Sequence, residues 1–335
     1  MARRTRTSPW ARLFATGVKA MARSTSRTTT RAVAQSLKAG ADALKPPPGP
    51  GAWIPGMAIG ATGARRYRLY QPPGTKFGER LPLMVMLHGC AQDAKSFATC
   101  TRMNRIAASQ RFAVLYPEQD RLANAQGCWN WFDTRSGRAQ GEAALIMRAI
   151  DQVCLLYPVD RTRVAVAGLS AGASMAALLA TKYPGRFKAV VMHSGIPPGT
   201  AHSSLSALGA MRGRRSATVP IAAAGTTGTA WPPLMVIHGG MDPVVSVRNG
   251  QAAVQLWADA HGATASQSRS VQRGKRHALT ITDFKSGRNI VARWVEVGRL
   301  GHAWSGGAAG QAFSDAQGPD ASRMAWAFAL KQFDA

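Results

Sequence analysis

The chain has 335 residues, of which 46% are hydrophobic, and its formal net charge at pH 7 is +26. This length accommodates one large α/β domain with extensions, and the hydrophobic share is ordinary for a folded globular protein. No apolar run approaches the ~18 residues of a membrane-spanning helix. The four cysteines lack the spacing of a zinc site. Composition therefore predicts neither a transmembrane segment nor a bound metal.

The N-terminal region differs from the rest of the chain. Residues 1–45 contain ten Lys or Arg and one acidic residue, Asp42, and residues 46–51 form a Pro/Gly segment typical of a stiff linker. We expect residues 1–52 to be an extension and residues 53–335 to fold as one domain.

The apolar residues between positions 10 and 22 are interrupted by Arg12 and Lys19. They lack the continuous apolar core of a secretory signal and are interpreted as a short basic amphipathic helix. An organellar transit peptide and a disordered tail are the alternatives.

Apolar strand-like and helix-like stretches alternate after residue 53. The predicted strands are 65–70, 82–87, 112–116, 163–168, 188–193, 234–238 and 290–297. The predicted helices are 96–109, 141–156, 172–183, 247–261 and 320–332, with loops or a small excursion over 198–231. This alternation predicts an α/β fold, a mostly parallel, doubly wound sheet flanked by helices.

A Gly-x-Ser-x-Gly motif, residues 168–172, lies between a predicted strand and a predicted helix. This context indicates a nucleophile elbow, a tight turn that presents Ser170 at the tip of the sheet. Glycine on both sides avoids clashes in such a turn. The alternative is an ordinary strand-to-helix turn with a serine cap.

A serine nucleophile needs a base and a carboxylate to orient that base. Asp242 and His302 each follow a predicted strand, and the order Ser, Asp, His is that of α/β-hydrolases. Asp283, which is interpreted as a turn residue, is the main rival carboxylate. His193 is interpreted as a core histidine.

The strand 82–87 ends in His88-Gly89-Cys90, a turn that fits an oxyanion loop. We expect the backbone N–H groups of Cys90 and Ala171 to form the oxyanion hole. The alternative is a simple helix-entry turn capped by Asp93.

Several segments together resemble the catalytic domain of short-chain-length poly(3-hydroxybutyrate) depolymerases and related esterases. They are Leu87-His88-Gly89-Cys90-Ala91-Gln92, Tyr116-Pro117-Glu118-Gln119, Cys128-Trp129-Asn130-Trp131-Phe132, the motif around Ser170, His238-Gly239-Gly240-Met241-Asp242, Gly301-His302-Ala303-Trp304 and Gly318-Pro319-Asp320-Ala321-Ser322-Arg323.

The resemblance spans roughly residues 53–333 and implies an α/β-hydrolase that cleaves carboxylic esters. It implies a catalytic triad of Ser170, Asp242 and His302, with no cofactor and no metal. Hydrolysis of 3-hydroxyalkanoate oligomers or polymer is the favoured activity. Feruloyl and acetylxylan esterases share the family and remain the alternative.

If the loops converge as the resemblance implies, Gln92, Trp129, Trp131 and Trp304 lie near the substrate. We expect at least one of Trp129 and Trp304 to line the acyl pocket. Packing in the core is the alternative for each tryptophan.

The cysteines allow three pairings. Cys90 and Cys128 both belong to loops that border the expected site, so we hypothesise a disulfide between them, with Cys100 and Cys154 as free thiols. Such a bond favours an oxidising compartment, extracellular or periplasmic.

The excess of positive charge favours anionic surfaces. No nucleic-acid-binding fold or motif is recognisable, so specific nucleic-acid binding is not expected. The basic extension is expected to make weak contact with an anionic or granule surface. A non-catalytic protein that binds polyanions is the most distant alternative.

Overall fold

The computed structural model describes residues 46–76, 78–216 and 230–334. The chain divides into two units, Met1–Pro48 and Gly49–Ala335, and every helix and strand of the described residues belongs to the second unit. The expectations for residues 1–45 lie outside the described residues. In the described part of the chain, no helix combines the length and the apolar character needed to cross a bilayer.

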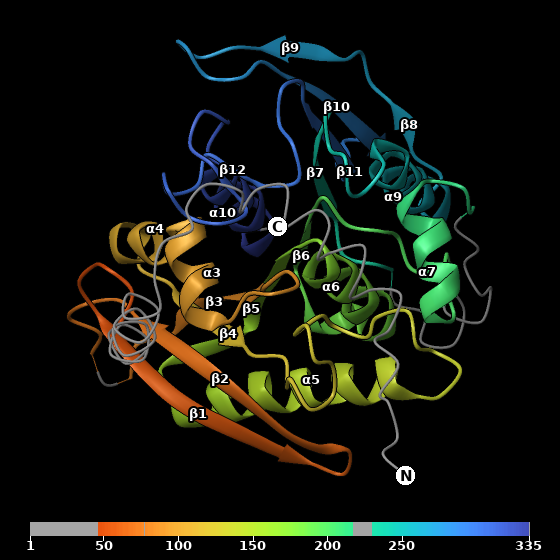
Figure 1. The fold of residues 1–335 in the computed structure, drawn as a ribbon. Coiled ribbons are helices and arrows are strands. Elements are labelled where there is room, and N and C mark those ends of the chain that lie inside the picture. The colour runs from red at the N-terminus through yellow and green to blue at the C-terminus, as the bar shows by residue number, and fades with distance from the viewer. Residues whose placement is uncertain (1–45, 77, 217–229, 335) are drawn as a thin grey trace, which may run out of the picture. The chain divides into compact units, whose positions relative to one another are not determined.

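A single large sheet of eleven strands organises this unit (Figure 1). Along its main path the strand order is β1-β2-β4-β3-β5-β6-β7-β11-β10-β8, and β9 pairs with β10. The strands are β1 Ala52–Gly60, β2 Gly63–Gln71, β3 Leu81–Leu87, β4 Ala113–Pro117, β5 Val159–Leu169, β6 Ala189–His193, β7 Leu234–Gly239, β8 Thr264–Ala265, β9 Arg269–Val271, β10 Leu279–Ser286 and β11 Asn289–Val297. A separate small sheet pairs β12 Trp304–Ser305 with β13 Ser314–Asp315.

The centre of the sheet, from β4 to β11, is parallel, and antiparallel strands flank it on both sides. Every residue of β3, β4 and β6 is buried. Burial on both faces explains why these strands are continuous apolar runs. The carboxyl ends of the parallel strands meet at one edge, where α/β sheets place their ligand sites.

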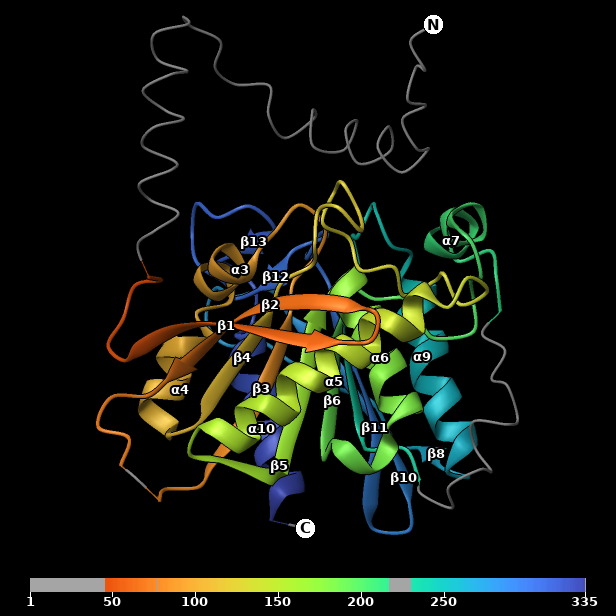
Figure 2. The same cartoon turned by 90° about the horizontal axis from the view of Figure 1, so that it is seen from below.

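Helices cover both faces of the sheet (Figure 2). They are α3 Ala94–Thr101, α4 Met103–Gln110, α5 Arg138–Leu156, α6 Ala171–Lys182, α7 Ser204–Met211, α9 Val247–Ala260 and α10 Ala321–Phe333, with a 3-10 turn η1 at Pro184–Arg186. The core between α3, α4, α10 and the sheet forms one continuous apolar cluster. This arrangement confirms the predicted α/β-hydrolase fold.

Three features differ from the sequence-based prediction. The helix predicted over 96–109 is two helices, because Arg102 adopts a left-handed conformation with φ 55°. The sequence pattern did not predict the antiparallel strands β1, β8, β9 and β10 or the short strands β12 and β13. Asp283 lies within β10 and not in a turn, which is possible because Arg269 and Arg293 pair with its carboxylate.

Candidate active site

Ser170, Asp242 and His302 follow three parallel strands, β5, β7 and β11, at the same edge of the sheet. Only β6 separates β5 from β7, and β7 pairs directly with β11. Residues about 60 to 130 positions apart in the chain are therefore brought to one place by strand order alone.

The turn at Ser170 is tight and strained. Ser170 has φ 55°, and its N–H donates to the carbonyl of His193, 2.9 Å away. A Cβ on Gly172 would lie 2.1 Å from the carbonyl oxygen of Leu87, and a Cβ on Gly168 would lie 2.3 Å from the carbonyl carbon of Gly172. Only glycine fits either position. The serine is thereby held at the N-terminus of α6, as a nucleophile elbow requires.

Asp242 and His302 form a hydrogen-bonded pair, with Nδ1 of His302 2.8 Å from Oδ2 of Asp242. The other carboxylate oxygen accepts from the N–H groups of Val244 and Val245, each at 2.9 Å. Because Nδ1 is engaged by the carboxylate, Nε2 is the nitrogen of His302 that is available for proton transfer.

The side chain of Asp242 is fully buried. Burial alone would raise its pKa, but the hydrogen bond and charge of His302, together with nearby His238, outweigh it and lower the pKa to about 2. Asp242 is therefore a carboxylate at neutral pH.

Two further histidines are buried beside this pair. Nε2 of His238 lies 2.9 Å from the carbonyl of Val245 and 3.5 Å from Asp242. His193 stacks on Trp304, and its Nε2 accepts from the N–H of Ser305 at 3.1 Å. Burial lowers the pKa of His193 to about 3 and also lowers that of His238. Both rings are therefore neutral, and they support the loops that carry Asp242 and His302.

The loop after β3, which is expected to carry an oxyanion donor, is held by a side-chain hydrogen bond and a left-handed residue. Oε1 of Gln92 accepts from the N–H of Gly89 at 2.9 Å, and Ala91 has φ 62°. Apart from the bonds within helices and strands, no backbone hydrogen bond of the described residues has the N–H of Cys90 or of Ala171 as its donor, and the first residue of a helix, here Ala171, has no acceptor within it. Asp93 caps α3 in a capping box with Ser96, so the loop is also a helix entry, the alternative that the sequence left open.

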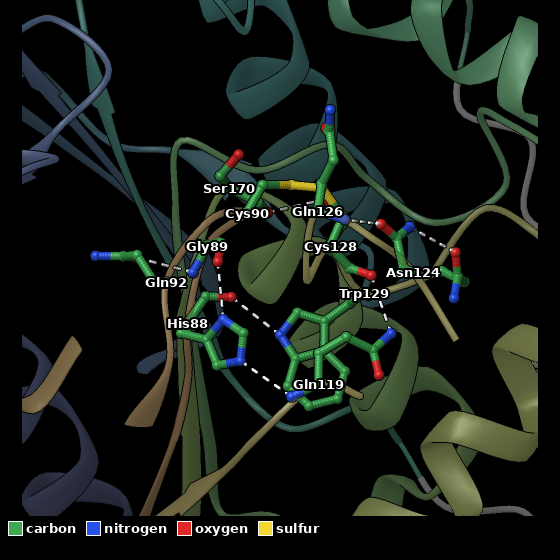
Figure 3. The surroundings of a disulfide bond; sticks show 12 residues. His88, Gly89, Cys90, Gln92, Gln119, Asn124, Gln126, Cys128, Trp129 and Ser170 are labelled. Atoms are coloured by element: carbon green, nitrogen blue, oxygen red, sulfur yellow. Dashed lines mark hydrogen bonds between the residues drawn. A yellow bond between two sulfur atoms is a disulfide. The ribbon is translucent and has the colours of Figure 1, made fainter. Parts of the chain in front are cut away.

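A disulfide joins Cys90 to Cys128, the hypothesised pairing (Figure 3). Next to it, the indole N–H of Trp129 donates to the carbonyl of His88 at 2.9 Å. Nε2 of His88 accepts from the backbone N–H of Gln119 at 3.1 Å. These bonds tie the loop after β3 to the segment 119–129 through one covalent and several polar links.

Sequence reasoning missed a buried polar network beneath these loops. Glu142 of α5 accepts from the side-chain amide of Gln119 at 2.7 Å and from the N–H of Asn130 at 2.9 Å. Arg65 of β2 donates to the carbonyl of Glu118 at 3.0 Å and also to the side chain of Gln119. The available signal was an acidic residue in the otherwise apolar face of the helix predicted over 141–156.

The residues expected at the substrate have other contacts in the structure. Trp129 and Trp304 are fully buried, and the indole N–H of Trp304 donates to Ser322 at 3.0 Å. Trp131 is 5% exposed and packs edge-on against Phe132, and Gln92 is 6% exposed. Each of the two fully buried indoles fills a core position and satisfies its N–H internally, so core packing, the alternative for these tryptophans, describes their contacts in the structure.

Comparison with known proteins finds a polyester depolymerase and several esterases among the relatives of this chain. The chain is 32% identical over 188 residues to Poly(3-hydroxyalkanoate) depolymerase C of Paucimonas lemoignei, covering 54% of this chain and 45% of the depolymerase. It thus spans less than half the length of that relative. It is 27% identical over 238 residues to Feruloyl esterase B of Neurospora crassa, covering 67% of this chain and 80% of the esterase.

Solved structures agree on the fold. The acetyl xylan esterase from Aspergillus awamori superposes with a TM-score of 0.60 at 19% identity, covering 75% of this chain and 94% of that one. The S-formylglutathione hydrolase from Staphylococcus aureus superposes with a TM-score of 0.54 at 14% identity, covering 86% of this chain and 100% of that one. The family model for Esterase PHB depolymerase matches residues 65–272, and the chain belongs to that family.

Proposed function

We propose that the protein is a serine hydrolase that cleaves carboxylic esters through an acyl-enzyme. One observation carries the proposal. Ser170, held at φ 55° at the head of α6, shares a sheet edge with the hydrogen-bonded pair of His302 and Asp242. Membership in the esterase family supports the same chemistry.

In the first step, His302 takes the proton of Ser170 while the serine oxygen attacks the ester carbonyl. The N–H groups of Cys90 and Ala171 stabilise the oxyanion, and losing one such donor typically costs roughly 100- to 1000-fold in rate. Asp242, ionised in the buried site, fixes the tautomer of His302 and stabilises its protonated form. His302 then protonates the leaving alcohol.

In the second step, water attacks the acyl-enzyme with His302 as the base, which releases a carboxylic acid and restores Ser170. Neither step calls for a cofactor. Among the described residues, no group of His, Cys, Asp and Glu is placed to hold a metal ion.

The substrate that we favour is an ester chain of 3-hydroxyalkanoate units, oligomeric or polymeric. The family description and the depolymerase of Paucimonas lemoignei support this choice. Feruloyl or acetylxylan esters are the second candidate, because relatives of both kinds match more than half of the chain. Contact of the basic residues 1–45 with an anionic or granule surface is part of the proposal, and the disulfide is compatible with an oxidising compartment.

Covalent labelling tests the chemistry. Intact mass after incubation with a fluorophosphonate is expected to show one adduct on the wild type and on Ser109→Ala, which changes an exposed serine of α4. We expect no adduct on Ser170→Ala and loss of essentially all its ester turnover with the fold intact. Labelling of Ser170→Ala to the wild-type extent would refute the assignment.

A substrate panel separates the two candidates. We expect kcat/KM for 3-hydroxybutyrate trimers to exceed that for methyl ferulate and for acetylated xylo-oligosaccharides. If kcat/KM shows the reverse order and the protein is still labelled by the fluorophosphonate, the serine hydrolase assignment would stand and the polyester substrate would be contradicted.

A further inference from the structure

A cavity of about 500 Å³ lies away from Ser170, on the face of the sheet that α10 covers in part. Its floor comes from β7, β11 and β10, one wall from α10, and the other wall from β9 and the loop after that strand. Figure 1 shows β9 at the outer edge of the sheet beyond β10. This volume is in the range of small-molecule sites.

Strand register explains the apolar floor. Val295 of β11 pairs with Ile281 of β10, and Leu279 of β10 pairs with Val271 of β9. Side chains two apart in a strand share a face, so these four residues line one surface. Phe328 of α10 faces the same cavity.

The rim is strongly basic. Six cations line the cavity: Arg269, Arg273, Arg276, Arg293, Arg323 and Lys331. Asp283 forms ion pairs with Arg269 and Arg293. Asp320 forms an ion pair with Arg323. Arg276 donates to the carbonyl of Gly318. In the part of the chain that is described, Arg273 and Lys331 have no ion-pair partner.

We propose that this cavity binds an anionic amphiphile, a carboxylate carried on an aliphatic chain. The apolar floor accommodates the chain, and the unpaired cations Arg273 and Lys331 at the rim attract the carboxylate. Residues 1–45 do not suit the cavity, because they are basic like its rim. The site is separate from the proposed catalytic residues and does not depend on their role.

Calorimetric titration with decanoate tests the proposal. Two further probes are 1-decanol, which lacks the negative charge, and acetate, which lacks the long aliphatic chain. Decanoate is expected to bind more tightly than either. The double variant Arg273→Glu, Lys331→Glu should weaken decanoate binding about tenfold, because each reversal replaces an attraction with a repulsion. The matched control Arg248→Glu, Arg288→Glu makes the same charge change at exposed positions on α9 and in the β10–β11 turn.

A second variant tests whether the aliphatic chain of decanoate occupies the cavity. Ala327 is exposed on α10 and lines the cavity, so Ala327→Trp fills the cavity without disturbing the core and is expected to reduce decanoate binding at least tenfold. Gln251→Trp, exposed on α9, should bind like the wild type.

Three outcomes would overturn the proposal. They are 1-decanol binding as tightly as decanoate, equal losses in the charge-reversed and control variants, and unchanged binding by Ala327→Trp. Sedimentation with phosphatidylglycerol vesicles without binding of free decanoate would indicate a membrane-facing surface in place of a ligand site.

Discussion

At the scale of single residues, the site depends on a buried charge. Asp242 is ionised although its side chain is fully buried, because one oxygen accepts two backbone N–H bonds and the other faces His302. An isolated carboxylate in that position would be strongly disfavoured. The same contacts that hold the histidine therefore keep its carboxylate partner charged.

We predict a stability signature for this residue. The folded-state pKa of Asp242, about 2, lies below the ordinary 3.8, so its contribution to the free energy of unfolding is present above about pH 4 and is lost as the pH falls toward 2. The contribution is about 2 kcal/mol. Urea unfolding of the wild type and of Asp242→Asn at pH 5 and pH 2.5 should give a stability difference that shrinks at the lower pH. A difference independent of pH would contradict the assigned charge.

At the scale of elements, the junction of β5 and α6 determines where the serine lies. The strand runs directly into the helix, and α6 approaches the end of β3 so closely that the backbone of Gly172 contacts the carbonyl of Leu87. Nucleophile and oxyanion loop are thus held together by backbone packing. The disulfide between Cys90 and Cys128 adds a covalent restraint from the other side.

A pair of glycine variants tests this junction. Gly172→Ala is expected to destabilise the protein by about 3 kcal/mol and to reduce kcat, because its methyl group would overlap backbone atoms that cannot move independently. Gly209→Ala, within α7, meets only the side chain of Arg215 at ordinary distance and should stabilise by roughly 0.5–1 kcal/mol. Thermal unfolding and ester turnover measure both. Equal tolerance of the two substitutions would show that the close approach at the junction is not required.

At the scale of the whole molecule, positive charge is spread over the chain. The net charge is +26, and residues 1–45, with ten basic residues and one acidic residue, contribute +9 of it. Long-range attraction to anionic surfaces is therefore expected from the extension and from the domain alike, and it should weaken with salt.

Removing residues 1–45 should leave kcat/KM for a soluble ester within about twofold, because the proposed catalytic residues all lie in the unit Gly49–Ala335. The same deletion should weaken co-sedimentation with anionic particles at low salt. Full-length protein in about 0.5 M NaCl provides the comparison, since salt at that strength screens the charge of the extension. Undiminished co-sedimentation after the deletion would assign surface contact to the folded domain alone.

The sequence by itself determined the parallel centre of the fold and the candidate triad. Buried parallel strands must be apolar throughout, and the strained turn at Ser170 requires glycine on both sides. Both features can therefore be recognised from short stretches of the sequence. Tertiary structure decided what depends on distant partners. Asp283 belongs to a strand only because two arginines meet it there, Glu142 is buried only because loop amides surround it, and Trp129 and Trp304 are core residues because neighbouring elements close over them. The burial of these polar and aromatic side chains is set by long-range packing, which their local sequence does not encode.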